Sequence, residues 1–242
     1  MERGGAARFP TTRWSRVIAA AGSGAAGREA LERLCETYWY PLYAFARRSG
    51  RDAERALDLT QGFFARLLDK TDLDAVDRER GRFRSWLLAG LKHFMANEWD
   101  REKALKRGGA VHFIAIDSGD AEGRYQCEPQ SEVDAERLYD RRWAFLIIEG
   151  ALAALRSRCK TAAERAFVDR MAPFLAGQEI EGEYEALAAE LDTTPGALKT
   201  RLSRSRDRFW ALVRAEVAET LENPDEVDDE LRYLIEVVGS AW

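Results

Sequence analysis

Basic side chains are concentrated between Leu198 and Phe209, in a chain whose net charge is −5. Guanidinium and ammonium groups bind phosphates, and small or hydroxylated residues at the start of a helix stand where base edges are approached. The basic residues are Lys199, Arg201, Arg204, Arg206 and Arg208, and the small or hydroxylated ones are Thr193, Thr194, Gly196 and Thr200. Their combination predicts a surface that contacts duplex DNA.

Two short helices must position these side chains. The first is expected from Tyr184, with Leu187 and Leu191 on one apolar face. A turn follows, after which Thr194 suits an N-cap and Pro195 suits the first helical position. A short helix, a tight turn and a basic second helix form a helix-turn-helix, whose second helix enters the major groove. The alternative is a solvated amphipathic helix pair, which the clustering of basic residues in an acidic protein disfavours.

A second basic stretch, residues 82–107, has apolar residues at helical spacing and aromatic rings between its cations. Basic groups for phosphates and aromatic faces for bases are what a protein that binds single strands requires. The cations are Arg82, Arg84, Lys92, Arg101, Lys103, Lys106 and Arg107, and the rings are Trp86, His93 and Trp99. A helix with buried aromatics and a solvated basic face fits the same pattern, and it is the better interpretation of this stretch alone.

The helix expected over 52–68 has an apolar arc that is wider than one small core needs. Part of the arc would then face a partner protein, or the helix is central and packs on two sides. The two interpretations are equally consistent with the pattern.

The composition indicates a helical protein. Of its 242 residues, 46% are hydrophobic and 33% are charged, and only 111–116 has a strand-like pattern. We expect an all-α fold: two helical domains joined by a flexible linker, the second containing the helix-turn-helix, and a short acidic C-terminal helical extension. The expected boundaries are 12–105, 106–132, 133–215 and 216–242. The expected helices are 28–48 (kinked or divided at Pro41), 52–68, 82–106, 133 to beyond 155, 162–175 and 227–238.

The sequence lacks the residue patterns that identify enzymes, metal-binding proteins and proteins held by disulfides. The histidines are His93 and His112, and the cysteines Cys35, Cys127 and Cys159 are far apart. The sequence therefore predicts no catalytic residues, no cofactor, no metal site and no disulfide framework. It contains no signal-peptide pattern and no apolar run of about 20 residues that would cross a membrane. We expect a cytoplasmic, monomeric protein without a membrane partner.

Two blocks of sequence, in this order and separated by a linker, suggest a family. The first is DLTQGFFARLL (58–68) with RFRSWLLAGLKHFMANEWDR (82–101), and the second is LDTTPGALKTRLSRSRDRF (191–209). Together they resemble a bacterial RNA polymerase sigma factor of the extracytoplasmic-function (ECF) group. The first block is similar to the region that binds the polymerase clamp and then opens and reads the −10 element. The second is similar to the region-four helix-turn-helix that reads the −35 element.

Further stretches, FPTTRWSRV, YWYPLYAFARR, KRGG and the C-terminal extension, are similar to a long-chain subgroup. Members of related groups are often linked to Ser/Thr protein kinases. The resemblance implies core RNA polymerase, through its β′ clamp and β flap, and promoter DNA as partners, with a Ser/Thr protein kinase or an anti-sigma factor as regulator. It also implies a protein that is not an enzyme.

The resemblance also implies roles for individual residues. Polymerase would be bound by Leu57, Asp58, Gln61 and Gly62. The −10 strands would be contacted by Lys92, His93, Asn97 and Arg101, and a flipped base would lie in the loop 70–81. The −35 element would be contacted by Lys199, Arg201, Ser203 and Arg204. This chain has Lys92-His93 in place of the family's Arg-Asn pair, and Asn97 in place of an Asp.

The polymerase-facing patch would be less acidic than is usual in the family, because Leu57 and Gly62 replace acidic residues. One hypothesis is that a phosphate on Thr60 adds about −1.5 to −2 charge beside Asp58. The favoured alternative is that Thr60 lies inside the apolar arc and bonds to the Ala56 carbonyl.

Residues 215–238 are strongly acidic. They could fold back on the recognition helix or on the −10 helix and restrain DNA binding until polymerase binds. The favoured alternative is a solvated acidic helix that caps the last domain, with an apolar face of Leu231, Leu234, Ile235 and Val238.

The alternative function is that of a stand-alone helix-turn-helix regulator that binds operators without polymerase. Such a regulator would need a dimer to read a two-fold site. The sequence contains no evident dimer seam, and the block around Asp58 would then have no role. Co-purification with core polymerase separates the two functions.

Overall fold

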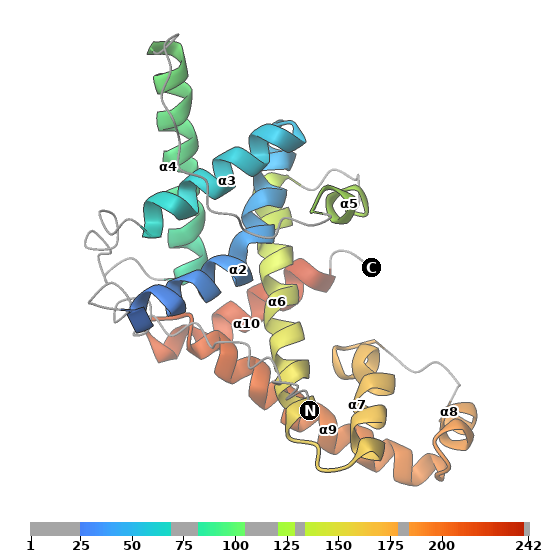
Figure 1. Cartoon of the computed structure of the whole chain (residues 1–242). Helices are drawn as coiled ribbons and strands as arrows, with labels where there is room; N and C mark the ends of the chain where they lie inside the picture. Colours follow the sequence, from blue (N-terminus) through green and yellow to red (C-terminus); the bar gives the residue numbers. More distant parts are fainter. Residues whose placement is uncertain (1–24, 69–81, 105–120, 129–133, 179–183, 240–242) are drawn as a thin grey trace. The chain divides into compact units, whose positions relative to one another are not determined.

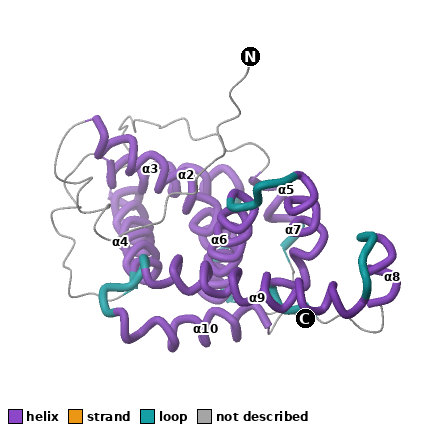
Figure 2. The backbone as a smooth tube through the Cα atoms, turned by 90° about the horizontal axis from the view of Figure 1, so that it is seen from below, coloured by secondary structure: helices purple, strands orange, loops and turns teal. Residues whose placement is uncertain are grey.

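The computed structural model describes residues 25–68, 82–104, 121–128, 134–178 and 184–239 (Figure 1). Within these ranges every regular element is a helix, and the only strand-type pairing is an isolated antiparallel bridge between Arg82 and Leu221 (Figure 2). The all-α prediction is confirmed for these ranges. None of the helices in them is both long and apolar enough to cross a membrane.

The chain divides into two compact units after Phe145 and again after Val217. The N-terminal unit contains the described residues up to Phe145 and those from Ala218 onward. Its helices are α2 (Ala25–Arg48), α3 (Ala53–Leu68), α4 (Phe83–Ala104), α5 (Ala121–Gln126), the first half of α6 (Ala135–Ser157), η2 (Pro224–Glu226) and α10 (Val227–Gly239). The helix-turn-helix unit, residues 146–217, contains the rest of α6, α7 (Ala162–Leu175), α8 (Tyr184–Glu190) and α9 (Pro195–Ala218).

Local sequence signals fix several helix starts. Asp52 accepts a hydrogen bond from the backbone N–H of Arg55 at 2.8 Å, which caps α3. Thr161 and Glu164 form a reciprocal capping box at the start of α7, whose bounds match the predicted 162–175. Pro41 lies inside α2. It does not divide that helix, contrary to one of the two expectations.

Aromatic residues form the centre of the N-terminal unit. The ring of Tyr38 stacks on Trp143 with centroids 4.4 Å apart, and Phe83 meets Tyr38 edge-on at 5.5 Å. Tyr38, Phe83 and Trp143 are all buried. Because these residues come from α2, α4 and α6, the first half of α6 belongs to the core of this unit, which the expected boundary at 133 did not include.

Two glycines let α3 and α4 approach closely. A Cβ on Gly62 of α3 would lie 3.0 Å from Cζ of Phe94, and a Cβ on Gly90 of α4 would lie 3.1 Å from Cε2 of Phe63. Each glycine therefore makes room for a ring from the opposite helix. This packing places α3 between α2 and α4 (Figure 1) and favours the interpretation of its wide apolar arc as a helix packed on two sides.

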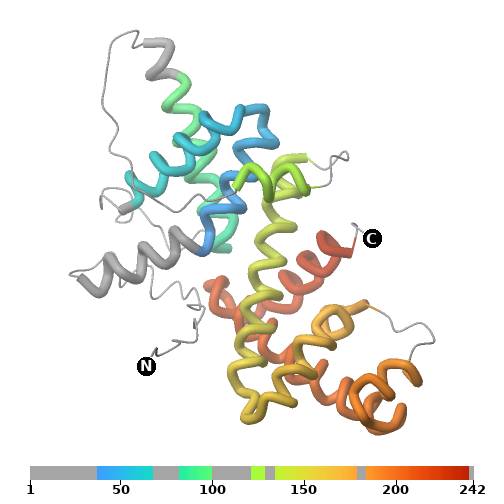
Figure 3. The backbone as a smooth tube through the Cα atoms, turned by 45° about the vertical axis from the view of Figure 1, so that its right-hand side comes forward, coloured from blue at the N-terminus to red at the C-terminus, as the bar shows by residue number. Residues whose placement is uncertain are grey.

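The acidic extension is not a cap of the last domain. Helix α10 belongs to the N-terminal unit, where the backbone N–H of Phe83 bonds to the carbonyl of Thr220 at 3.1 Å. Figure 3 shows α10, in red, beside the first half of α6. The buried residues of α10 are Val227, Glu230, Leu234 and Val237. The predicted apolar face is therefore wrong at Ile235, which is 52% exposed.

Within the expected linker 106–132 the structure describes α5, a helix of six residues that the sequence analysis did not predict. Other predictions lie outside the described residues: the loop 70–81, the extended piece 111–116, the stretches FPTTRWSRV and KRGG, and the side chain of Arg101.

Candidate functional site

The turn between α8 and α9 has a defined geometry. The N–H of Thr193 bonds to the carbonyl of Ala188 at 2.9 Å, and the N–H of Asp192 bonds to that of Ala189 at 3.3 Å. This pair of bonds is the Schellman ending of a helix, which requires a left-handed residue. Asp192 takes that position with φ 49°. Asp192 therefore ends α8 and begins the turn that leads to α9.

The start of α9 is capped as the sequence predicts. The hydroxyl oxygen of Thr194 accepts from the N–H of Ala197 at 3.2 Å, and Pro195 takes the first helical position. Gly196 is exposed, and a Cβ there would meet no atom within 4 Å. The first turn of α9 thus presents backbone N–H groups and small side chains to solvent, as an anion-binding helix start does.

The two faces of α9 differ sharply. Leu198, Leu202 and Phe209 are buried. Within α9, the exposed side chains among the residues predicted to contact DNA are Lys199, Thr200, Arg201, Ser203 and Arg204. Among the described residues, no carboxylate forms an ion pair with Lys199 or Arg204. These cations are available for phosphates or base edges.

Two residues of α9 that are predicted to contact DNA also contact α7. Arg206 donates from Nε to the carbonyl of Phe174 at 2.9 Å, at the end of α7. Its guanidinium therefore contacts the C-terminus of α7, and its contact with DNA stays a prediction. Arg201 lies over the ring of Phe167, with Cζ 3.7 Å from the centroid. This stacking orients Arg201 while leaving it exposed.

A groove of about 1020 Å³ runs along α9, between this helix and the corner that joins α6 to α7. The corner contributes Arg158 and Lys160, both exposed, opposite Arg204 and Arg208. Sequence reasoning missed Arg158 and Lys160, because they lie outside the helix-turn-helix. Glu164 also lines the groove, but the basic residues outnumber it, so the groove carries a net positive charge.

The start of α4 is not a free basic surface. Arg84 is 7% exposed and donates from Nε to Glu230 Oε1 at 2.6 Å, and it also pairs with Asp140. Arg82 pairs with Glu230 at 3.0 Å. The assignment of Arg84 to DNA is therefore corrected.

Further along α4 the predicted residues are accessible. His93 and Asn97 are exposed, and Lys92 is half-buried and pairs with Glu136 of α6. Trp86 stacks on Phe83, at 5.6 Å between centroids, and belongs to the core side of the helix. Trp99 is 48% exposed. The second half of α4 thus holds the accessible aromatic and polar groups.

The residues of α3 that are predicted to bind polymerase differ in their exposure to solvent. Leu57 and Asp58 are half-buried, whereas Gln61 and Gly62 are buried. Thr60 is fully buried, and its hydroxyl donates to the Ala56 carbonyl at 2.7 Å. Phosphorylation of Thr60 would require α3 to open first. The favoured alternative for this residue agrees with the structure.

The part of the expected linker that the structure describes is tied to the N-terminal unit by ion pairs. Arg47 of α2 donates from Nε to Glu122 Oε2 of α5 at 2.8 Å, and Tyr43 donates to the same oxygen at 2.7 Å. The hydrogen bonds from Arg47 lower the pKa of Glu122 to about 2. Burial of the carboxyl raises this pKa, and the hydrogen bond from Tyr43 lowers it further. The Tyr40 hydroxyl donates to Glu128 Oε1 at 2.7 Å.

Comparison of the chain with known protein families, with curated proteins and with solved structures finds no match. The assignment of a role therefore depends on the residues and geometry described above.

Proposed function

We propose that the chain is a promoter-specificity subunit of bacterial RNA polymerase, of the ECF sigma type. In this role α9 binds the −35 duplex, the second half of α4 binds the −10 strands, and α3 contacts the polymerase clamp. The protein then works in the cytoplasm without a cofactor or chemistry of its own. The observation that best supports the proposal is the capped start of α9, with Lys199 and Arg204 exposed.

The geometry of α9 supports duplex recognition in particular. A recognition helix contacts base edges through its N-terminal residues. Thr200 and Ser203 alternate with the two cations on this exposed stretch, and Arg201 is held by Phe167. An arginine bound to a guanine edge contributes about 1–3 kcal/mol of discrimination, whereas a lysine on phosphate contributes charge without sequence preference.

Transcription in vitro by purified core polymerase, on a library of promoters, tests the proposal directly. The full-length protein should select one class of promoters with two separated sequence elements. Lys199→Ala and Arg204→Ala should weaken binding to the selected −35 duplex at unchanged thermal stability. Arg165→Ala, an exposed cation of α7, is the charge-matched control and should have little effect. Equal losses for all three variants would indicate nonspecific attraction and contradict recognition by α9.

The stand-alone regulator is distinguished by polymerase binding. Asp58→Ala should weaken co-purification with core polymerase and leave the affinity for −35 duplex unchanged, because α3 and α9 belong to different units. Arg66→Ala, at an exposed position of α3, serves as the control on the same helix. A wild-type chain that binds an operator tightly but never co-purifies with polymerase would favour the regulator.

A further inference from the structure

The corner between α6 and α7 is an exposed, irregular connection with a basic sequence. Its residues 158–161, Arg-Cys-Lys-Thr, follow the end of α6 at Ser157 and precede the start of α7 at Ala162. Thr161 is exposed, and its backbone is extended, with φ −118° and ψ 160°. A hydroxyl in an exposed, extended connection is accessible to a modifying enzyme without unfolding of the unit around it.

The residues before this hydroxyl form a charge pattern. Arg158 stands three residues before Thr161, and a lysine stands directly before it. Ser/Thr protein kinases whose substrate grooves are acidic select their substrates by patterns of this kind. Among the described serines and threonines, only Thr161 and Ser85 follow an arginine by three residues. Ser85 lies in the first turn of α4, where Arg82 pairs with Glu230 at 3.0 Å. Thr161 is therefore the described hydroxyl at which this pattern is accessible.

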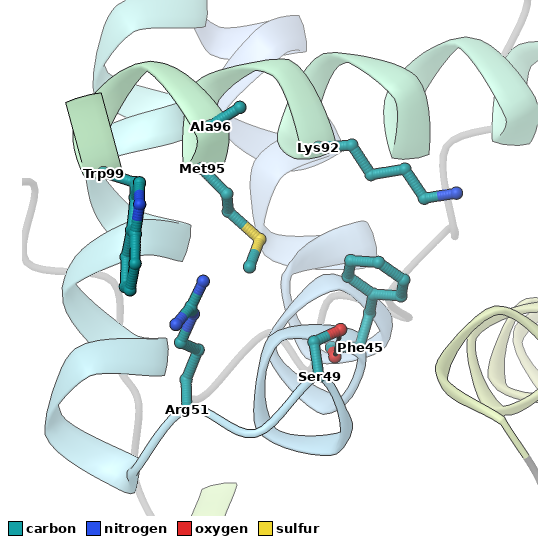
Figure 4. Close-up of a pocket in the computed structure, with 7 residues that line it drawn as sticks. All are labelled: Phe45, Ser49, Arg51, Lys92, Met95, Ala96 and Trp99. Atoms are coloured by element: carbon teal, nitrogen blue, oxygen red, sulfur yellow. Dashed lines mark hydrogen bonds between the residues drawn. The ribbon is translucent and has the colours of Figure 1, made fainter.

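The cations before Thr161 are exposed. Arg158 and Lys160 form no ion pair with a carboxylate among the described residues. Arg51 of the N-terminal unit is half-buried by contrast, and its guanidinium packs over the ring of Trp99, with Cζ 5.3 Å from the centroid (Figure 4). The basic side chains at the α6–α7 corner are therefore available both to an acidic kinase groove and to a phosphate.

A carboxylate already lies where a phosphate on Thr161 would be held. Oε2 of Glu164 accepts from the backbone N–H of Lys160 at 2.6 Å and from that of Thr161 at 3.3 Å. Hydrogen bonds from these two backbone groups, followed by the charges of Arg201 and Lys160, lower the pKa of Glu164. Arg201 of α9 thus lies close enough to the start of α7 to attract an anion there.

A phosphate at this position would draw a cation away from the exposed face of α9. Arg201 is held over the ring of Phe167 of α7, with Cζ 3.7 Å from the centroid, and it remains exposed. A phosphothreonine carries about −1.5 to −2 charge at pH 7, which is more than the carboxylate of Glu164 carries. It would pair with Arg201 and would also place negative charge beside the groove that Arg204 lines. Fewer cations would then remain for DNA, whose own phosphates would be repelled.

We propose that Thr161 is phosphorylated by a Ser/Thr kinase with an acidic substrate groove, and that the phosphate withdraws Arg201 from DNA. In the reaction the hydroxyl oxygen of Thr161 bonds to the γ-phosphorus of ATP, and the bond from that phosphorus to the oxygen bridging to the β-phosphate breaks. ADP leaves, and the hydroxyl proton passes to the catalytic carboxylate of the kinase. The effect on DNA rests on the proposed function of α9, whereas the modification itself does not.

Labelling of the folded, full-length protein tests the site. The protein is incubated with Mg·ATP and a purified kinase domain that selects arginine three residues before its acceptor, and peptide mapping by mass spectrometry locates the phosphate. Thr161→Asn should take no phosphate at the corner and should keep the start of α7, because asparagine is a good N-cap. Arg158→Ala should be labelled about 10- to 150-fold more slowly, the loss that removal of one hydrogen-bonded charge causes. Arg165→Ala, which removes an exposed cation after the acceptor, should be labelled like the wild type.

Binding to the selected −35 duplex tests the consequence. The phosphorylated wild type should bind about 5- to 150-fold more weakly than the unmodified protein, the usual range of coupling between two sites. The slope of log affinity against log salt should fall by about 0.9, because one phosphate contact is lost. In Arg201→Ala the further loss on phosphorylation should be smaller than in the wild type. Thr161→Asn treated with kinase and ATP should bind the duplex like untreated Thr161→Asn.

Four results would overturn the inference. Two concern the site: a folded protein without phosphate at Thr161 when a peptide of residues 154–166 is labelled, and phosphate at Ser85 in place of Thr161. Two concern α9: equal duplex affinity of the phosphorylated and unmodified proteins, and an equal loss on phosphorylation in Arg201→Ala and the wild type. The proposed function fails by a different result, absence of promoter-specific transcription by the unmodified wild type.

Discussion

Arg84 at the start of α4 donates to Glu230 of α10 at 2.6 Å, although 146 residues separate them. Both side chains are buried, and Asp140 of α6 contacts the same guanidinium. Tyr233 donates to Asp140, and burial together with this bond raises the pKa of Tyr233 to about 12, so its hydroxyl remains a donor. The extension is therefore a structural part of the N-terminal unit.

Removal of Glu230 should destabilise the N-terminal unit strongly. Glu230→Ala leaves the buried guanidinium of Arg84 short of one carboxylate, and breaking a buried pair costs about 3–5 kcal/mol. Glu236→Ala, at an exposed position of the same helix, should change the free energy of unfolding by less than about 0.5 kcal/mol. Urea unfolding followed by circular dichroism measures both. Equal stability of the two variants would show that α10 is not held by this contact.

The same cluster explains what the sequence could and could not predict. Helix bounds follow from periodicity and caps, so 162–175 and the capping role of Thr194 were predictable. The inward face of α10 was not, because Glu230 is a charged residue whose burial depends on a distant arginine. Helix α5 was missed for a similar reason, since its short, glycine-containing sequence is held by Arg47 and Tyr43 of another helix.

The candidate site also contains residues whose environment was predictable from the sequence and residues whose environment was not. Periodicity correctly placed Leu198 and Leu202 inside and the cations of α9 outside. It could not separate Arg206, which bonds to the end of α7, from Arg204, because both lie on the polar side of the helix. Contacts with other helices decide which cations remain exposed, and those contacts cannot be inferred from periodicity alone.

A side chain at Gly62 should destabilise the N-terminal unit while Phe94 is present. Gly62→Ala places a Cβ 3.0 Å from Cζ of Phe94, and overpacking of this kind costs about 1–3 kcal/mol. Phe94→Leu should relieve the clash, so the double variant should be more stable than the sum of the single variants predicts. Gly150→Ala is the control. It has open space in α6 and should stabilise by about 0.5–1 kcal/mol. Additive losses at Gly62 and Phe94 in a thermal unfolding cycle would contradict the interlocking of α3 and α4.

Thr60 should accept an apolar replacement and reject a charged one. Thr60→Val keeps the shape and loses one hydrogen bond to the Ala56 carbonyl, a change of about 1 kcal/mol. Thr60→Glu buries a carboxylate without a partner and should unfold at a much lower urea concentration. If Thr60→Glu were as stable as the wild type and bound core polymerase more tightly, phosphorylation of Thr60 would become the better explanation.

The turn of the helix-turn-helix contains removable strain. Asp192 has φ 49°, a conformation that glycine adopts at lower energy than other residues. Relief of the left-handed strain exceeds the unfolded-state entropy that a glycine adds, so Asp192→Gly should stabilise the helix-turn-helix unit by about 0.5 kcal/mol. Asp207→Gly, at an exposed position within α9, should destabilise it by about 1 kcal/mol. Opposite shifts of the two melting temperatures would support the Schellman geometry, and a loss in both would count against it.

Docking of α5 should depend on pH through Glu122. The hydrogen bonds from Arg47 and Tyr43 lower the pKa of this carboxyl to about 2, from an ordinary value of 4.5, although burial acts in the opposite direction. A depressed carboxyl pKa stabilises the folded state above the unfolded value, and this contribution is lost as the pH falls through the folded value. Amide exchange in α5, corrected for its intrinsic pH dependence, should therefore accelerate between pH 4.5 and 2. Glu122→Gln should remove that step and give faster exchange at neutral pH. The same pH step in Glu122→Gln as in the wild type would assign the transition to another carboxyl.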